Sequence, residues 1–332
     1  MIKIVAVTGA SGFLGRQLVT DLVNRNYQVR CLIREKSKAF FKENDNLRLF
    51  QVDWSSLESI KTALKGVHIV VHSAAIHPER GIGNSREIME FNVNGTRRLL
   101  ENLDNVERFI LVSSMRALIN KTSDGIFDEN SNYDFQKYDT PYGYSKFLSQ
   151  QICFDFFRKK KLPLLVVNPT PIIGPLDLGP SPNGKFILEF IKTKIVFTLK
   201  CSYGFVDVRD VSSAIELLFR HGVFGENYLL CSANWPLKEF IEKIHCLIGI
   251  KKPIIEIPLP IAYCLGMIFD LLVLIKPGMT LPVTRSTVEF AALNPVFNGE
   301  KIKKLGFSYI NPNKTLKDSL DWLINNYGNL QK

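Results

Sequence analysis

The sequence lacks the features that define several large classes of protein. It has no internal repeat and no low-complexity tract, and its 46% hydrophobic and 22% charged residues are ordinary proportions, which excludes disordered and collagen-like chains. The six cysteines are scattered without a CxxC pair, so we expect no metal site and a reducing, cytoplasmic setting. The composition therefore predicts a globular protein.

Long apolar runs are also scarce. The apolar run that ends at Val7 is followed at once by Thr8 and Gly9. It is too short for the core of a signal peptide and predicts a strand instead. The nearly continuous apolar stretch 259–275 is interrupted by Asp270 and barely reaches the roughly 20 residues of a spanning helix. We expect it to form a helix of a substrate-binding lobe rather than a membrane contact.

Basic residues exceed acidic ones, which gives a formal net charge of +10. No basic run interleaved with aromatic residues accompanies this excess, so a nucleic-acid partner is not expected. A positive field would instead favour phosphate-bearing cofactors and anionic substrates. The charge is that of a basic enzyme rather than of a nucleic-acid-binding protein.

Short apolar runs alternate with amphipathic segments through the first half of the chain. Apolar runs without polar alternation suit strands buried on both faces of a parallel sheet, and their alternation with helices predicts a doubly wound α/β fold. The expected strands are 3–7, 29–33, 47–52, 69–72, 109–112 and 164–167, and the expected helices are 13–24, 56–64, 86–102 and 144–159.

The 332 residues exceed one compact domain. Closely spaced prolines after residue 168 end the regular pattern. We expect residues 1–175 to form the nucleotide-binding domain, with 203–222 returning to it. Residues 176–202 and 223–330 would form a smaller, mixed C-terminal substrate lobe.

A glycine-rich loop, TGASGFLG at residues 8–15, directly follows the first expected strand and opens a helical pattern. Glycines at such positions allow a tight turn and let backbone N–H groups approach a pyrophosphate at the helix N-terminus. This context predicts a dinucleotide site of the Rossmann type. The expected binding residues are Gly9, Ser11, Gly12, Phe13, Leu14 and Gly15.

The residue at the end of the second strand indicates whether a dinucleotide fold binds NAD or NADP. An acid there would bind the ribose hydroxyls of NAD, but this chain has Arg34, with Lys36 close by. Because these cations suit a 2′-phosphate, we expect NADP. The adjacent Glu35 keeps NAD as the alternative. Asp53, at the end of the third strand, would either accept a hydrogen bond from the adenine amino group or serve as a turn residue.

Tyr142 and Lys146 are four residues apart at the start of a helical run, which places them on one helix face. A nearby ammonium favours the phenolate, so the tyrosine can exchange a proton with the oxygen of a carbonyl/alcohol couple. Ser113 and Ser114 close the fifth strand at the edge where doubly wound sheets bind ligands. A serine hydroxyl there can hydrogen-bond the reacting oxygen or the cofactor.

Several motifs together resemble the extended short-chain dehydrogenase/reductases, also called the NAD-dependent epimerase/dehydratase family. The resemblance implies a catalytic triad of Ser114, Tyr142 and Lys146, with Asn92 nearby and Lys146 on the nicotinamide ribose. It further implies that the cofactor is lined by Ser73, Ala74, Ala75, Pro169 and Ile172. The motifs are TGASGFLG, VVHSAAI (70–76), FNVNGTRRLLE (91–101), FILVSSM (109–115), YGYSK (142–146), NPTPIIGP (168–175) and FVDVRDV (205–211).

Within this family the chain is most similar to dihydroflavonol-reductase-like and hopanoid-associated epimerase-like members, which fits Asn168-Pro169 where nucleotide-sugar epimerases usually carry Arg-Pro. Met115-Arg116 replaces the acid pair of sugar-nucleotide dehydratases, which argues against dehydration. We expect an NAD(P)(H)-dependent oxidoreductase acting on a small-molecule carbonyl or alcohol. The alternatives are a nucleotide-sugar epimerase with tightly bound NAD and a non-catalytic NADP-binding regulator. The resemblance also suggests a homodimer formed through helix packing.

Overall fold

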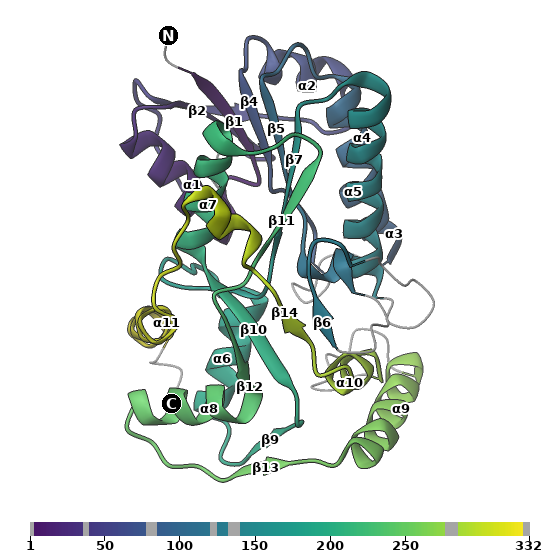
Figure 1. Cartoon of the computed structure of the whole chain (residues 1–332), viewed down its shortest axis with the longest axis vertical. Coiled ribbons are helices and arrows are strands. Elements are labelled where there is room, and N and C mark those ends of the chain that lie inside the picture. Colours follow the sequence, from purple (N-terminus) through teal and green to yellow (C-terminus); the bar gives the residue numbers. More distant parts are fainter. Residues whose placement is uncertain are drawn as a thin grey trace.

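The computed structural model describes residues 3–35, 40–77, 85–119, 125–131, 140–275 and 285–327. Its centre is a seven-stranded parallel sheet with the order β11-β7-β5-β4-β1-β2-β3 (Figure 1). This order reverses beside β1, as in a doubly wound fold, which confirms the predicted α/β class. The strands are β1 (Ile4–Thr8), β2 (Gln28–Ile33), β3 (Leu47–Gln51), β4 (Ile69–His72), β5 (Arg108–Val112), β7 (Leu164–Pro169) and β11 (Glu226–Leu230).

Helices cover both faces of the sheet (Figure 1). Alternate side chains of β1 face opposite sides, so Val5 and Val7 belong to one apolar core and Ala6 to the other. Because both faces are covered, the central strands β1, β4, β5 and β7 are almost entirely buried and consist mainly of apolar residues. The first core includes α1 (Phe13–Asn24) and α7 (Val208–His221), and the second includes α2 (Leu57–Leu64), α4 (Gly95–Glu101) and α5 (Pro141–Lys160).

The segment predicted as one helix over 86–102 is divided into three parts. α3 (Ser85–Met89) and α4 are ordinary α-helices, but the stretch Glu90–Asn94 between them is a π-helical turn. Such turns insert one extra residue into a helix and occur often at functional sites. Hydrophobic periodicity does not distinguish this local widening from a continuous helix.

The C-terminal part forms smaller sheets and a separate apolar core around Phe205, Phe240 and Leu316, below the large sheet in Figure 1. Three sheets, β12-β10-β8, β13-β9 and β14-β6, contribute to this part. Its helices are α6 (Pro182–Lys192), α8 (Leu237–Leu247), α9 (Leu259–Ile275), α10 (Arg285–Ala292) and α11 (Pro312–Tyr327). The strands of these smaller sheets are β6 (Ile126–Phe127), which comes from the first half of the chain, β8 (Ile172–Ile173), β9 (Val196–Thr198), β10 (Ser202–Asp207), β12 (Ala233–Pro236), β13 (Ile254–Glu256) and β14 (Val296–Phe297). Two 3-10 turns cover Met115–Leu118 and Lys301–Leu305.

The positions of α7, β11 and α9 can be compared with the expected division into a nucleotide-binding domain and a substrate lobe. α7, within 203–222, packs on α1 in the core of the large sheet. β11 belongs to the stretch assigned to the lobe, yet it pairs with β7 and forms the edge of the large sheet. α9 covers the apolar stretch 259–275 and packs along α10. Among the described residues, no helix has the length and apolar character needed to cross a membrane.

Candidate active site

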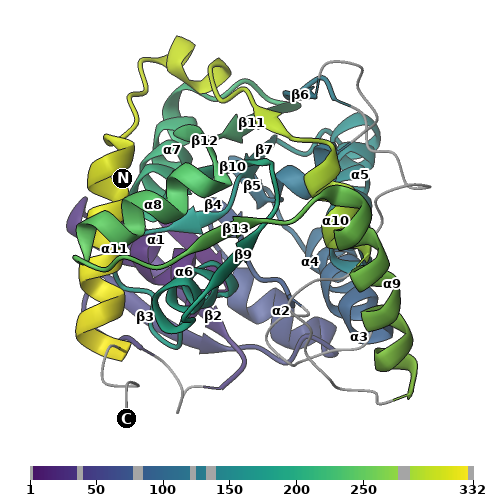
Figure 2. The same cartoon turned by 90° about the horizontal axis from the view of Figure 1, so that it is seen from below.

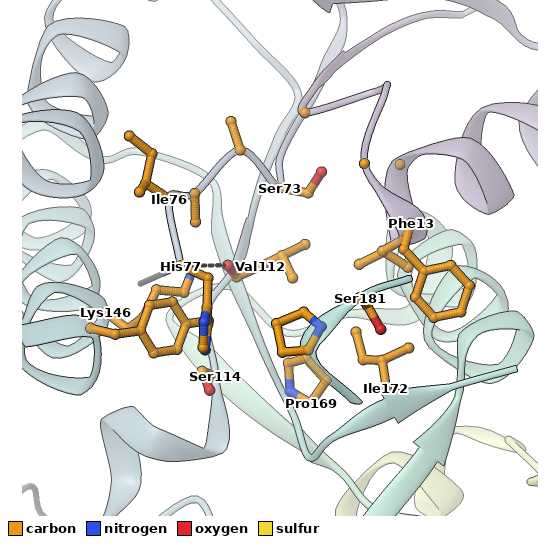
Figure 3. A pocket seen from close by; sticks show the side chains of 18 of the residues that line it. Phe13, Ser73, Ile76, His77, Val112, Ser114, Lys146, Pro169, Ile172 and Ser181 are labelled. Atoms are coloured by element: carbon orange, nitrogen blue, oxygen red, sulfur yellow. Dashed lines mark hydrogen bonds between the residues drawn. The ribbon is translucent and has the colours of Figure 1, made fainter. Parts of the chain in front are cut away.

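A cavity of about 620 Å³ opens at the carboxyl ends of the parallel strands (Figure 3). This is the edge at which open α/β sheets bind ligands. Its walls include residues that directly follow β1, β4 and β5. The structure brings together in this cavity all the predicted site residues except Asn92 and Asp53: Gly9, Ser11, Gly12, Phe13, Leu14, Gly15, Arg34, Ser73, Ala74, Ala75, Ser113, Ser114, Tyr142, Lys146, Pro169 and Ile172.

The glycine loop permits two close backbone approaches. Gly9 has a φ of +70°, and a Cβ on it would lie 2.8 Å from the backbone nitrogen of Ala74. A Cβ on Gly15 would lie 2.1 Å from the carbonyl oxygen of Gly9. Both distances are below any normal contact, so these two positions require glycine. They hold the loop tightly between β4 and the first turn of α1.

The cavity fits a dinucleotide in two respects. α1 begins after Gly12, which offers no side-chain cap, and no acid lies in the first turn. The backbone N–H groups at this end are therefore suited to a phosphate. The buried hydroxyl of Ser113 has no hydrogen-bond partner among the described residues and lies in the cavity wall. A bound nucleotide would satisfy it.

The first turn of α5 carries the predicted catalytic pair. Thr140 caps the helix by accepting a 3.0 Å hydrogen bond from the backbone of Gly143, and Pro141 occupies the first turn. Tyr142 is half-buried at this N-terminus, and Lys146 follows one turn later. The helix dipole favours negative charge in the first turn, so it favours a phenolate on Tyr142.

Lys146 is almost fully buried, with 5% of its surface exposed. Its Nζ donates a 2.7 Å hydrogen bond to the carbonyl oxygen of Val112, drawn as a dashed line in Figure 3. Burial lowers the pKa of Lys146 to about 8, because the charged form loses its hydration. The ammonium is thus held at the end of β5 with a proton that it can lose near neutral pH.

Ser114 occupies the turn that follows β5. Its Oγ accepts a 3.2 Å hydrogen bond from the backbone of Arg116 and caps the 3-10 turn. The side-chain amide of Asn168 donates 3.0 Å hydrogen bonds to the carbonyl oxygen of Ser114 and to Oε1 of Gln150. Asn168, which replaces the arginine usual in nucleotide-sugar epimerases, therefore positions the serine turn.

Asn92 lies in the π-helical turn behind the cavity wall. Its side chain donates to the carbonyl oxygen of Ile76 (3.1 Å) and to Oγ of Ser145 (2.9 Å), and it accepts from the backbone of Ile76 (2.8 Å). Its own carbonyl oxygen accepts from the hydroxyls of Thr96 and Ser149. Asn92 thus links the loop after β4 to α5, and its contacts are those of a positioning residue.

Asp53 does not line the cavity. Its carboxylate is exposed and accepts hydrogen bonds from the backbone and the hydroxyl of Ser55, which also lower the pKa of Asp53. The neighbouring Trp54 lines the cavity instead. Of the two roles open to Asp53 from the sequence, its contacts here are those of a turn residue.

His77 is a cavity residue that sequence reasoning assigned no site role. Its ring centroid lies 4.3 Å from that of Tyr142, and Figure 3 shows it on the same side as Lys146 and Ser114, opposite Phe13 and Ile172. A single histidine after a strand carries no signal for this contact. No group of three or more potential metal-ligating side chains occurs within the described ranges.

His72, by contrast, is structural. It is buried between the hydroxyls of Thr8 (2.8 Å) and Thr96 (3.0 Å). Burial, with a smaller effect of the nearby Lys146, lowers the pKa of His72 to about 3, so the imidazole is neutral at physiological pH. It joins β1 and β4 to α4 beneath the cavity floor.

Arg34 is exposed at the rim where β2 ends, and its guanidinium carbon lies 5.6 Å from the ring centre of Phe91. It also lines a second cavity of about 740 Å³ that shares Trp54 and Phe91 with the first. Lys36 lies outside the described residues. The arginine therefore stands where the two cavities meet.

Residues 5–231 match the NAD dependent epimerase/dehydratase family, so the chain belongs to this family. It is an NAD(P)-dependent oxidoreductase of the extended short-chain dehydrogenase/reductase type. It is 30% identical over 255 residues to "Sterol demethylase protein B" of Methylococcus capsulatus, covering 76% of each chain. It is 29% identical to "Cinnamoyl-CoA reductase 2" of Medicago truncatula, covering 72% of this chain and 74% of that one.

Solved structures share the whole fold. The crystal structure of gox2253 has a TM-score of 0.84 and 28% identity, covering 99% of this chain and 100% of that chain. Yeast methylglyoxal/isovaleraldehyde reductase Gre2, complexed with NADPH, has a TM-score of 0.74 and 21% identity, covering 98% and 100%. The large sheet and the C-terminal lobe are thus a combination found in other proteins.

Proposed function

We propose that the chain is an NADP(H)-dependent reductase that converts a small-molecule carbonyl to a secondary alcohol. The observation that carries the proposal is the position of Tyr142 and Lys146, one helical turn apart in the wall of the cavity that also contains the glycine loop. The cinnamoyl-CoA reductase name of a similar protein supports a reductase. The six free cysteines support a reducing, cytoplasmic setting.

The residues of the chain have distinct roles in this reaction. The bound nicotinamide would supply the hydride that reduces the carbonyl carbon. The phenol of Tyr142 gives its proton to the carbonyl oxygen, and the hydroxyl of Ser114 donates a hydrogen bond to the same oxygen. The ammonium of Lys146 and the N-terminus of α5 stabilise the phenolate that remains. Asn92 and Asn168 position α5 and the serine turn through the contacts described above.

The overall reaction is tested by following NADPH absorbance during incubation with a panel of ketones, with product analysis for the corresponding secondary alcohols. We expect net consumption of NADPH with one equivalent of alcohol formed. The nucleotide-sugar epimerase alternative predicts isomerisation of a nucleotide sugar with no net change in absorbance, because its NAD is regenerated in each cycle. Nucleotide binding without turnover of either substrate class would favour the regulatory alternative.

Arg34 is expected to be the main determinant of NADP preference. Its planar guanidinium can donate two parallel hydrogen bonds to a 2′-phosphate, and hydrogen bonds to charged groups contribute roughly 1.5–3 kcal/mol. Arg34→Ala should therefore lower NADP affinity by about tenfold or more and leave NAD affinity nearly unchanged. Fluorescence titration of wild type and variant with both nucleotides measures this difference.

The matched control is Arg48→Ala, which removes an exposed arginine on β3 that lies outside both cavities. It should change neither affinity. Tighter binding of NAD than of NADP by the wild type, or equal losses for both nucleotides in Arg34→Ala, would show that Arg34 is an ordinary surface residue. Glu35 would then be the residue to test at the ribose.

A further inference from the structure

Exposed apolar side chains gather on one face of the C-terminal lobe. This apolar lobe face is formed by β9, β13 and α9, which all lie on the side of the molecule seen in Figure 2, with α9 at its edge. Phe197 is 60% exposed, and Ile261 and Ile268 are 53% and 54% exposed. Single exposed apolar residues are common, but such a cluster marks an interaction site. Its members are Ile195, Phe197, Ile255, Ile261, Met267 and Ile268.

The pairing of β9 with β13 directs two of these side chains outward. Val196 is paired with Ile254, and Phe197 with Ile255. Successive residues of a strand point to opposite faces, and paired residues share a face. Val196 and Ile254 pack into the lobe core, so Phe197 and Ile255 must face away from it. Their exposure follows from the register of the strands.

α9 has the same two-sided arrangement. Ala262 and Gly266 are buried on a helix that packs along α10. Ile261 and Ile268 are seven residues apart and therefore share the opposite, exposed side, with Met267 next to them. Residues 261–268 of this helix carry no charged side chain.

Lysines flank the strand part of this face. The two stretches 191–202 and 249–268 carry five lysines and one acid, Glu256. Lys192, Lys194, Lys200 and Lys251 are exposed. Apolar side chains flanked by lysines are the arrangement of proteins that lie in the interface of a bilayer. A second copy of the chain would bring the same lysines face to face, which is unfavourable.

We propose that the apolar lobe face docks this enzyme on the surface of a membrane that contains anionic lipids. The apolar side chains enter the headgroup boundary, and the lysines bind the lipid phosphates. α9 lies along the surface, because its 17 residues fall short of a spanning length. The sequence alone favoured a plain lobe helix for this stretch. The proposal adds to that expectation, because α9 lies on the same face of the molecule as β9 and β13 (Figure 2).

The test is co-sedimentation of the full-length protein with vesicles. One set contains phosphatidylcholine alone, and the other contains phosphatidylcholine and phosphatidylglycerol in a ratio of about three to one. We expect binding to the mixed vesicles, weakened by high salt, and little binding to neutral ones. The double variant Phe197→Glu/Ile255→Glu should bind the mixed vesicles at least tenfold more weakly. Leu57→Glu, which changes an equally exposed leucine on α2, should bind like wild type.

A second pair of variants tests the charges without touching an apolar contact. Lys194→Glu/Lys251→Glu should also lose most binding, whereas Lys304→Glu on the distant 3-10 turn should not. Melting temperature and NADP affinity report whether each variant is folded. Equal binding to both vesicle types, no binding to either, or binding that survives both double variants overturns the proposal. A lower mass of Phe197→Glu/Ile255→Glu than of wild type by light scattering would identify the face as a contact between two copies.

Discussion

Tyr142→Phe is expected to lower turnover by about two to four orders of magnitude, which is the usual contribution of general acid catalysis. The substitution removes one oxygen, the only atom of this side chain that can transfer a proton. The aromatic ring remains, so its contact with His77 at 4.3 Å between centroids is preserved. NADP affinity should therefore stay nearly unchanged. Steady-state kinetics and nucleotide titration of the same preparation separate the two effects.

Tyr144→Phe is the matched control. Tyr144 is half-buried two residues further along the same helix and lies outside the lining of the cavity. Removing its hydroxyl tests whether loss of any tyrosine oxygen from α5 impairs turnover, and we expect near wild-type rates. If Tyr142→Phe kept more than about a tenth of wild-type turnover, Tyr142 would not be the acid and the proposed mechanism would fail.

The second large effect is expected at Lys146. Only the ammonium form stabilises the phenolate, and burial lowers the pKa of this group to about 8. The kcat/KM for carbonyl reduction should therefore fall roughly tenfold per pH unit above about pH 8 as the proton is lost. Lys146→Arg should lack this alkaline limb, because a guanidinium does not deprotonate in proteins. If kcat/KM fell at the same alkaline pH in wild type and in Lys146→Arg, the titrating group would not be Lys146.

The lowered pKa of Lys146 also predicts that replacing this lysine stabilises the folded protein, although it abolishes activity. Folding lowers the pKa of Lys146 from 10.5 to about 8, so the buried ammonium destabilises the fold below pH 8. This cost decreases as pH rises from about 8 to 10, where the unfolded chain still binds the proton. Lys146→Met should abolish turnover yet raise the melting temperature at pH 7. The gain should shrink by pH 10, as differential scanning calorimetry can measure.

The sequence by itself determined the features that depend on local patterning. The central parallel strands are mainly apolar, and only glycine fits at Gly9 after β1 and at Gly15 in the first turn of α1. The doubly wound sheet and its phosphate loop were therefore predictable. The spacing of Tyr142 and Lys146 follows from helix geometry alone. Each of these sequence patterns determines the conformation of the same few residues that form it.

Tertiary structure decided the features that need contacts between distant segments. The π-helical turn around Asn92 contacts α5, whose Ser149 donates a hydrogen bond to the Asn92 carbonyl oxygen. Three contacts join parts of the chain that are far apart in sequence: the ring contact of His77 with Tyr142, the hydrogen bond from Asn168 to Ser114 and the pairing of β11 with β7. The apolar lobe face has the same origin. Hydropathy identifies apolar residues, but the folded lobe decides which of those on β9, β13 and α9 stay exposed, because burial is a property of the folded neighbourhood and not of the residue.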